Sequence, residues 1–502
     1  METSGTLDMS PLKRRVILLA MTGSLAMIFM DSTVVGVALP SIGTALELGE
    51  VSLYWVVNGY LLALAALLAI GGRIGDAIGK PLAFTIGVVV FALSSLACGL
   101  SPDGTTLIVA RVGQAIGAVL MQPASSAIAI STAAPGTEGR TMGIYVGVSM
   151  LGLLVGPLLG GVLTEHFGWS SIFYVNLPIA VITLALLAWA RPPRFQDVEG
   201  RIPWGDATLL AVSLSAFILG TQTLGQVIRS GWSLASVGVP VGILGIVWFV
   251  RRQFHDVRPL IGVALLRDRG FLVDATLLGL MNFALTGAII NLSVLLQISF
   301  GFEPLQAGIA TLPLVVPVIF MLQAAGRLFD RIGVRPLAVP AAVLVALSTV
   351  GMGFAAQAMS LTGLVIAMIG LGASNAFVTM PANTDGMQRF GPEKRGLASG
   401  VLQTFRMTGA TLGVAVTASV IAGFDADPSM MDGGDVPPET LAAACRGDFE
   451  AFTIVVADAP PACVDALRLA NAQGTGWAFV VAGLVAGLGV IVAMAWRPPV
   501  DR

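Results

Sequence analysis

Asp31 is a carboxylate inside a long apolar segment that starts at Val16. On a helix it lies about 16 residues, or about 24 Å, beyond Arg15, which places it in the far half of a hydrocarbon core about 30 Å thick. Arg111 lies a turn or two into another apolar segment, which begins near Thr105. If the two segments run in opposite directions, these charges lie at similar depth. An isolated charge at the membrane centre costs at least ~2.5–3.5 kcal/mol, so we expect Asp31 and Arg111 to be partners.

A buried carboxylate beside a guanidinium can bind and release a proton, because burial favours the neutral acid and the positive neighbour favours the carboxylate. Asp31 and Arg111 are therefore predicted to couple transport to protons; an ion pair that only fixes helix packing is the alternative. Asp274 lies five residues after Arg269. It is either solvated at the membrane interface or part of a second proton or substrate site, and we include it among the proton-coupling candidates.

Neutral polar residues and one further arginine also interrupt the apolar segments. Because such side chains face a bundle interior or a water-filled cavity, we expect them to line a substrate cavity. The predicted cavity residues are Asn58, Tyr60, Gln114, Asn282, Asn291, Gln403 and Arg406.

The elements that must position these residues are membrane-spanning helices. Hydrophobic residues make up 56% of the 502, the mean hydropathy is +0.88, and only 11% are charged, against roughly 25% in soluble domains. A spanning helix needs about 20 apolar residues, which predicts a polytopic all-α membrane protein with fourteen spans. These are 16–38, 51–72, 81–100, 105–128, 141–163, 170–190, 206–226, 232–250, 271–297, 305–325, 336–356, 361–382, 397–423 and 476–496.

The distribution of basic residues predicts the orientation of the chain. With both termini in the cytoplasm, the outer loops hold only Arg229, Arg446 and Arg468 of the 27 Lys and Arg residues. Arg111 and Arg406 lie within spans, and the others fall on the inner side. This asymmetry is the positive-inside rule, so we expect cytoplasmic N- and C-termini.

An internal repeat divides the chain. GGRIGDAIGKPLAF at 71–84 resembles AGRLFDRIGVRPLAV at 325–339, and EGRTMG at 138–143 resembles EKRGLA at 393–398 at nearly the same spacing. The expected domains are a six-helix bundle at 1–200, two inserted helices at 201–258, and a second six-helix bundle at 259–502 that includes an extracytoplasmic loop at 424–475. Two parallel repeats around a central cavity are typical of alternating-access transporters.

The fifth predicted span contains a stripe of glycines, Gly147, Gly152, Gly156 and Gly160, together with Pro157. Small residues at helical spacing allow another helix to approach closely, and proline permits a bend. The stripe predicts either ordinary tight packing or a seal between the two halves.

Other classes of protein are disfavoured. The two histidines and three cysteines lack metal-ligand spacing, and no nucleophile–base pair or Walker loop is present, so we expect neither a metal site nor an enzyme. The net charge of −2 gives no footprint for nucleic acid. The N-terminal apolar run is too long for a signal peptide. Cys445 and Cys463 share the predicted outer loop and either form a disulfide or remain free thiols.

Together these residues resemble the fourteen-helix drug:proton antiporter family of the major facilitator superfamily. Asp31-Ser-Thr with Ala38-Leu39-Pro40 is similar to its first-span motif, and Arg111-Val-Gly-Gln114 to its fourth-span motif. The stretch from Gly147 to Gly160 resembles the antiporter motif, and Trp169 through Asn176-Leu-Pro178 resembles the opening of the sixth span. The resemblance implies a cytoplasmic gate, for which the matching residues are Gly72, Arg73, Asp76, Gly79, Lys80, Arg327 and Asp330.

The expected function is export, in exchange for protons, of amphipathic compounds, which we expect to be cationic. The alternatives are an exporter of an endogenous metabolite, lipid or self-made antibiotic, and an uptake symporter. We expect a monomer in a bacterial cell membrane, with small-molecule substrate, protons and lipid as partners. No cofactor is expected other than the proton gradient.

Overall fold

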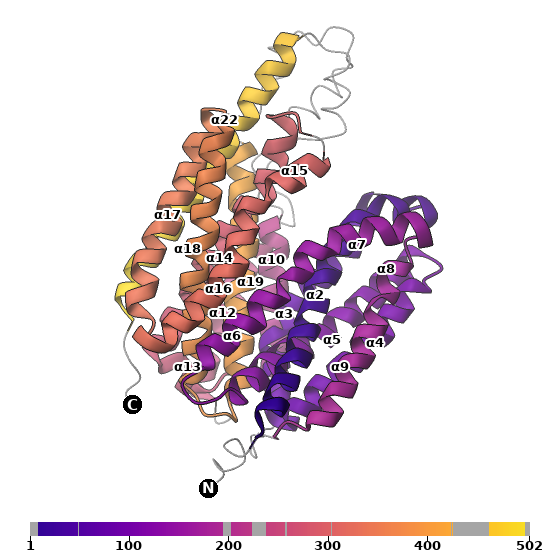
Figure 1. Ribbon diagram of the computed structural model, residues 1–502, viewed down its shortest axis with the longest axis vertical. Helices are drawn as coiled ribbons and strands as arrows, with labels where there is room; N and C mark the ends of the chain where they lie inside the picture. The colour runs from indigo at the N-terminus through magenta and orange to yellow at the C-terminus, as the bar shows by residue number, and fades with distance from the viewer. Residues whose placement is uncertain are drawn as a thin grey trace.

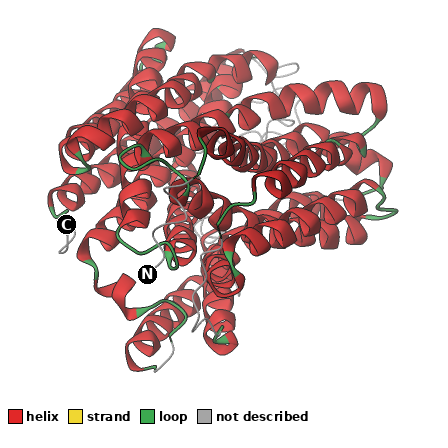
Figure 2. Cartoon of the chain, turned by 60° about the horizontal axis from the view of Figure 1, so that its bottom comes forward, coloured by secondary structure: helices red, strands yellow, loops and turns green. Residues whose placement is uncertain are grey.

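The computed structural model describes residues 9–48, 50–193, 202–222, 237–256, 259–302, 304–422, 424 and 461–496. Within these ranges the secondary structure is helical, without strands (Figure 2). Two groups of helices lie side by side, the first half of the chain in one and the second half in the other (Figure 1). We call the end of the bundle at which the first helix begins and the last helix ends the terminal end, at the bottom of Figure 1.

The first group corresponds to the predicted N-terminal bundle. Its helices are α2 (Pro11–Ala45), α3 (Glu50–Ile78), α4 (Lys80–Gly99), α5 (Gly104–Ser131), α6 (Glu138–Ser149), α7 (Leu151–Phe167), α8 (Ser171–Tyr174) and α9 (Asn176–Ala190). The helices α6 and α7 form one broken span, bent by 41° between Leu153 and Leu158. Pro157 lies at this bend, as expected for a residue that cannot donate a backbone hydrogen bond.

The two inserted helices are α10 (Trp204–Gln222) and α12 (Gly238–His255), which pack on each other. Buried Asp206 on α10 ties them together. Its Oδ1 forms an ion pair with Nε of Arg252 at 2.7 Å, and its Oδ2 accepts a hydrogen bond from Nε2 of Gln253 at 2.9 Å. On its other side α10 contacts α3 and α19, so the inserted pair lies against both halves.

The second group corresponds to the predicted C-terminal bundle. Its helices are α13 (Val263–Arg267), α14 (Arg269–Ile298), α15 (Pro304–Ala310), α16 (Leu312–Ile332), α17 (Arg335–Gln357), α18 (Leu361–Gln388), α19 (Arg395–Ala422) and α22 (Pro461–Met494). The broadest contacts within it join α17 to α22 and α14 to α19.

Local sequence explains where several helices begin. Four have a side chain that accepts a backbone N–H of the first turn, which satisfies one of the donors left over at a helix start. These caps are Ser10, Asp103, Asp268 and Ser360. Outside the spans, hydrogen bonds from the backbone and hydroxyl of Thr106 hold the pKa of the Asp103 carboxyl below its usual value.

Twelve helices in the described ranges are long and apolar enough to cross a membrane, and the bent pair α6–α7 makes a thirteenth. The eighth predicted span, 232–250, accounts for the difference from fourteen. It falls partly outside the described residues, and its described part lies in α12. The end of this helix carries Arg251, Arg252 and His255, so α12 is not among the apolar candidates. The protein is therefore an all-helical, multi-pass membrane protein, and the number fourteen stays a prediction, as do the cytoplasmic termini.

Two predicted boundaries differ from the structure. The segment 71–78, expected in a loop, continues α3 to Ile78; the chain breaks only at Gly79, whose φ of 94° suits glycine, and α4 starts at Lys80. Residues 461–475, expected in the outer loop, are the first turns of α22. Polar residues such as Arg468 and Asn471 lower the hydropathy of these first turns, so the predicted span begins only at 476. Residues 425–460 of that loop, with Cys445, lie outside the described residues, so the two alternatives for Cys445 and Cys463 are not distinguished.

Candidate functional site

Asp31 and Arg111 form an ion pair inside the first half. Asp31 projects from the middle of α2, and Nη1 of Arg111 on α5 donates to its Oδ2 at 2.5 Å. The exposed fractions of the two side chains are 0% and 1%. The pair that similar depth predicts is thus present, and it is shielded from solvent on every side in this conformation.

Two neutral amides complete the coordination of the Asp31 carboxylate. Its Oδ1 accepts from Nδ2 of Asn176 on α9 at 3.0 Å and from Nε2 of Gln114 on α5 at 3.2 Å. Ser95 on α4 accepts from the same two amides, at 3.3 and 2.7 Å. The carboxylate therefore links α2 directly to α5 and α9, and the two amides link this group to α4. A change in the charge of Asp31 alters contacts among these four helices.

The guanidinium of Arg111 is also held from several directions. Its Nε donates to the carbonyl of Val56 at 3.2 Å, and its Nη1 donates to Oε1 of Gln114 at 2.8 Å. The ring of Tyr60 lies 4.3 Å from Cζ, in the range of a cation–π contact. The hydroxyl of Tyr60 and Oδ1 of Asn176 are buried without a partner. They are one donor and one acceptor that a water molecule can use.

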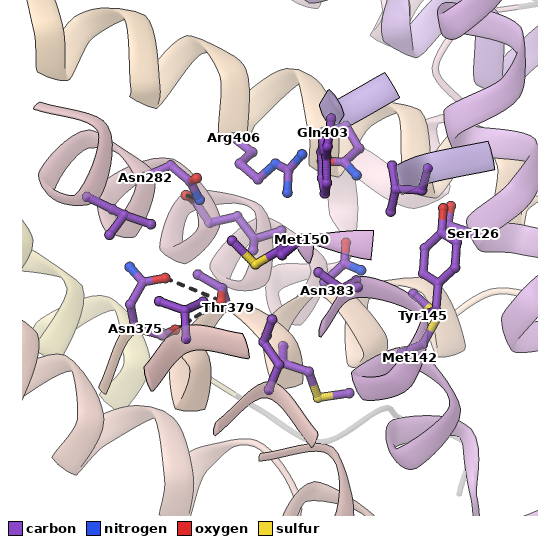
Figure 3. Close-up of a pocket in the computed structure, with 18 residues that line it drawn as sticks. Ser126, Met142, Tyr145, Met150, Asn282, Asn375, Thr379, Asn383, Gln403 and Arg406 are labelled. Carbon is purple, nitrogen blue, oxygen red and sulfur yellow. Dashed lines mark hydrogen bonds between the residues drawn. The ribbon is translucent and has the colours of Figure 1, made fainter. Parts of the chain in front are cut away.

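A cavity separates the two halves near the middle of the molecule. Its empty volume is about 710 Å³, and part of this volume is continuous with solvent. The first half contributes Leu25 and Phe29 from α2, Ser126 from α5 and Tyr145 from α6, while the second half contributes residues of α14, α16, α18 and α19 (Figure 3). Asp31 does not line this cavity, although Phe29 lies two residues before it on the same helix.

Three of the seven predicted cavity residues line the cavity: Asn282, Gln403 and Arg406. Tyr60 and Gln114 belong instead to the buried Asp31 cluster. Asn58 on α3 is half-buried and outside the lining. Asn291 is buried between α14 and α19, where it donates to the carbonyl of Gly287 and to Oγ1 of Thr417.

Sequence reasoning missed several polar lining residues. They come from α6 and α18. Each is a polar residue within a predicted apolar span or directly beside one, and that pattern could have identified them in the sequence. These residues are Tyr145, Asn375, Thr379 and Asn383. It also missed Ser95 and the role of Asn176 as a ligand of Asp31, because a neutral amide or hydroxyl in a span does not demand a partner as strongly as a charge does.

Asp274 lies away from the cavity, in a charged cluster at the terminal end of the second half. Nε of Arg389 donates to Asp385 at 2.8 Å and to Asp274 at 3.4 Å, and its Nη1 donates to Asp268 at 3.1 Å. Nε1 of Trp496 donates to Asp385 at 3.1 Å. Asp274 is fully buried and its Oδ1 has no donor. Three carboxyl groups thus share one guanidinium.

Arg389→Gln is expected to destabilise the protein by about 3–5 kcal/mol, because it leaves buried carboxylates without their cation. Asp274→Asn is expected to be nearly neutral, since it removes one surplus acid and keeps the shape. Thermal unfolding of the two purified variants, followed by intrinsic fluorescence, measures the difference. Equal losses in both variants would show that Arg389 is not what holds the cluster together.

The predicted gate residues join the halves at the terminal end. Asp76 at the end of α3 accepts from the backbone N–H groups of Gly396 and Leu397, at 3.0 and 2.6 Å, at the start of α19. Lys80 lies 2.7 Å from Asp76 and donates to the carbonyl of Glu393 at 3.1 Å. A helix N-terminus favours an anion, so this contact stabilises the association of the two halves. We call the contact of Asp76 with Gly396 and Leu397 the first latch.

The repeat places a second latch on the other side of the bundle. Asp330 at the end of α16 accepts from the backbone N–H groups of Gly139 and Arg140, at 2.7 and 2.9 Å, at the start of α6. Both latches therefore bind a carboxylate of one half to a helix start of the other. Gly72 lies against the backbone of Gly396, while Arg327 is exposed and Arg73 is half-buried.

Asp76→Asn is expected to weaken the first latch, because an amide oxygen is a poorer acceptor at a helix N-terminus than a carboxylate. The population with the terminal end open should rise by about 5- to 150-fold, the range of coupling energies of 1–3 kcal/mol. Spin labels at the exposed positions Leu12 and Arg335, in a cysteine-free background, measure the distance between the halves. An unchanged distance distribution would contradict the latch.

The glycine stripe packs on two different partners. Gly147 faces the backbone of Ile319 on α16, in the other half, whereas Gly152, Gly156 and Gly160 face α2. A Cβ at Gly156 would meet Thr33 and the carbonyl of Met30, on either side of Asp31 along the chain. The first part of the stripe thus lies between the halves, and the second part brings α7 against the helix that carries Asp31.

No group of three His, Cys, Asp or Glu side chains in the described ranges is arranged to hold a metal ion. The arrangement contains instead a buried acid–arginine cluster, a cavity between two repeats and a paired latch. These three features are typical of proteins that move a solute across a membrane.

Comparison with known proteins agrees with this arrangement. Residues 21–414 match the description of the Major Facilitator Superfamily. The chain is 31% identical over 509 residues to the tetracenomycin C resistance and export protein of Streptomyces glaucescens, covering 96% of this chain and 91% of the relative. It is 34% identical over 454 residues to the puromycin resistance protein of Streptomyces alboniger, covering 86% and 85%.

Among solved structures, the proton:xylose symporter XylE is similar in fold. The TM-score is 0.64, the sequence identity is 14%, and the alignment covers 97% of this chain and 96% of that one. At this identity the likeness concerns the arrangement of helices alone.

Proposed function

The chain belongs to the major facilitator superfamily, and from that premise we propose that it is a drug:proton antiporter of the fourteen-helix kind. The relatives named for resistance and export support an exporter. The observation that carries proton coupling is the buried Asp31–Arg111 pair, since an ionisable group in a span is functional by default. The inserted pair α10 and α12, between two six-helix groups, supports the fourteen-helix assignment.

In this proposal the terminal end faces the cytoplasm, as the distribution of basic residues predicts. The two latches at Asp76 and Asp330 then close the cytoplasmic side. The conformation described is the one from which substrate leaves outward. Return to the inward-facing state requires both latches to open.

The geometry favours indirect coupling. Asp31 lies outside the cavity lining, so a substrate in this conformation does not compete for it by contact. Protonation of Asp31 removes the charge that holds Arg111, Gln114 and Asn176 on α2. Because Leu25 and Phe29 of the same helix line the cavity, a shift of α2 changes the substrate site directly. Asp274, in the Arg389 cluster, is proposed as a second proton-coupling group.

The test is transport by the purified chain in liposomes with an acidic lumen. Outward proton flow should drive accumulation of tetracenomycin C above the level in protein-free liposomes, and nigericin, which collapses the pH gradient, should abolish it. Accumulation that persists without the gradient, or that requires ATP, would exclude the proposed function. Accumulation in the direction of proton flow would instead identify a symporter.

A further inference from the structure

The cavity between the halves carries one formal charge in the described part of the chain, and that charge is positive. Its lining includes Arg406 of α19 and contains no aspartate or glutamate. The sequence analysis predicts a cationic substrate, but Asp31, the buried carboxylate of the first half, lies outside this lining. A cation in this cavity would meet a guanidinium and no carboxylate.

Among the described residues, Arg406 has no counter-charge. It makes no ion pair with any of them, and its Nε is buried without a hydrogen-bond partner. The titratable side chain that faces it is Tyr145, whose hydroxyl is engaged with Oγ of Ser125 at 2.6 Å. An unpaired arginine is costly within a span, so its position in the cavity calls for a ligand or water. The Asp31 cluster shows the contrast, because there the guanidinium has a carboxylate at 2.5 Å.

Two amides near Arg406 are also unengaged. Gln403 lies one turn before Arg406 on α19, and Asn383 projects from α18 into the same space (Figure 3). Neither side chain makes a hydrogen bond within the described residues, whereas Asn375 donates to the carbonyl of Met281. A guanidinium and two free amides offer convergent donors, the arrangement that binds an anionic oxygen.

The rest of the lining is apolar. Leu25, Phe29, Met142, Met150, Leu278 and Leu322 surround the polar group from both halves. Large apolar side chains and flexible methionines accept varied ring systems without fixed geometry. The cavity therefore combines an apolar enclosure with a single site for negative charge.

We propose that the exported compounds are amphipathic organic acids, such as polycyclic phenols, enols or carboxylic acids, whose anionic oxygen binds Arg406. Gln403 and Asn383 donate to the same oxygen or to a neighbouring carbonyl, and the apolar lining covers the ring system. This inference specifies the substrate class of the proposed exporter and rests on that function. It replaces the sequence-based expectation of a cation.

The test uses two xanthene dyes of opposite charge, fluorescein as the anion and rhodamine 6G as the cation. Binding to the purified chain is measured by fluorescence polarisation at one pH, and transport in liposomes by filtration and lysis. The wild type should bind and move fluorescein in preference to rhodamine 6G. Arg406→Gln should weaken fluorescein binding by about 10- to 100-fold, the range of a hydrogen bond to a charged group. Arg406→Lys, which keeps the positive charge, should weaken fluorescein binding less than Arg406→Gln does.

Arg251→Gln is the matched control, because it removes an exposed arginine from the inserted helix α12. It should bind fluorescein as the wild type does, and size-exclusion chromatography checks the fold of every variant. Preference for rhodamine 6G, or fluorescein binding that survives Arg406→Gln unchanged, would overturn the inference. Gradient-driven transport of rhodamine 6G would also overturn the inference about the substrate class, but it would support the proposed function as an antiporter. Arg406-dependent fluorescein binding without gradient-driven transport would instead remove proton coupling and leave the substrate class standing.

Discussion

Asp31→Asn is expected to abolish proton-driven export, reducing it to the background of protein-free liposomes. The amide has nearly the same shape and can still accept from Gln114 and Asn176, but it cannot bind or release a proton. Arg111 keeps its contacts with the carbonyl of Val56, with Gln114 and with the ring of Tyr60, so the helices should stay packed while the coupling is lost. Gradient-driven accumulation in liposomes, compared at equal amounts of reconstituted protein, measures the effect.

Asp206→Asn supplies a matched control for Asp31→Asn. Asp206 is also a fully buried aspartate paired with an arginine, but it joins the inserted helices to each other. Its variant should keep gradient-driven export. If Asp31→Asn kept export as well, or if Asp206→Asn lost it equally, Asp31 would have no special part in coupling.

Arg111→Gln is expected to destabilise the protein by about 3–5 kcal/mol, because it leaves the Asp31 carboxylate buried without its cation. Asp31 must then take up a proton permanently or the helices around it must open. The variant should unfold at a lower temperature and transport nothing. Thermal unfolding of the purified protein, followed by light scattering and intrinsic fluorescence, measures the loss.

The double variant Asp31→Asn/Arg111→Gln separates stability from function. With both charges removed, the buried site again contains only neutral groups, so much of the lost stability should return. Transport should not return, since no group is left to carry the proton. A double variant as unstable as Arg111→Gln would show that the arginine stabilises the fold through Val56 and Tyr60 rather than through Asp31.

The Asp31–Arg111 pair was predictable because each is an isolated charge in an apolar helix, and the helical rise gives their depth. The cavity was predictable only in part. Depth is set by position along a helix, but rotation about the helix axis decides which residues face the cavity. Asn291 and Asn282 lie on the same helix, yet the first packs against Thr417 and the second reaches the lining.

The cluster around Asp274 could not be predicted for a different reason. Its central cation, Arg389, follows the last residue of α18 and reads in sequence as an ordinary cytoplasmic charge. Only the packing of α14, α18 and the residues after α22 brings Asp268, Asp385 and Trp496 to it. The gate motif, by contrast, was recognisable from its repeat, although Gly72, Arg73 and Asp76 proved to lie on the last turns of α3 and not in a loop.

Reciprocal coupling tests the central claim most directly. Liposomes containing the chain and a trapped pH indicator are set to equal pH on both sides, with the membrane potential clamped by potassium and valinomycin. A downhill gradient of the compound that the chain accumulates in liposomes with an acidic lumen should drive protons the opposite way with the wild type, and Asp31→Asn should show only the signal of protein-free liposomes. Wild-type movement of the compound without a pH change, or an equal pH change with Asp31→Asn, would contradict a proton exchange that runs through Asp31.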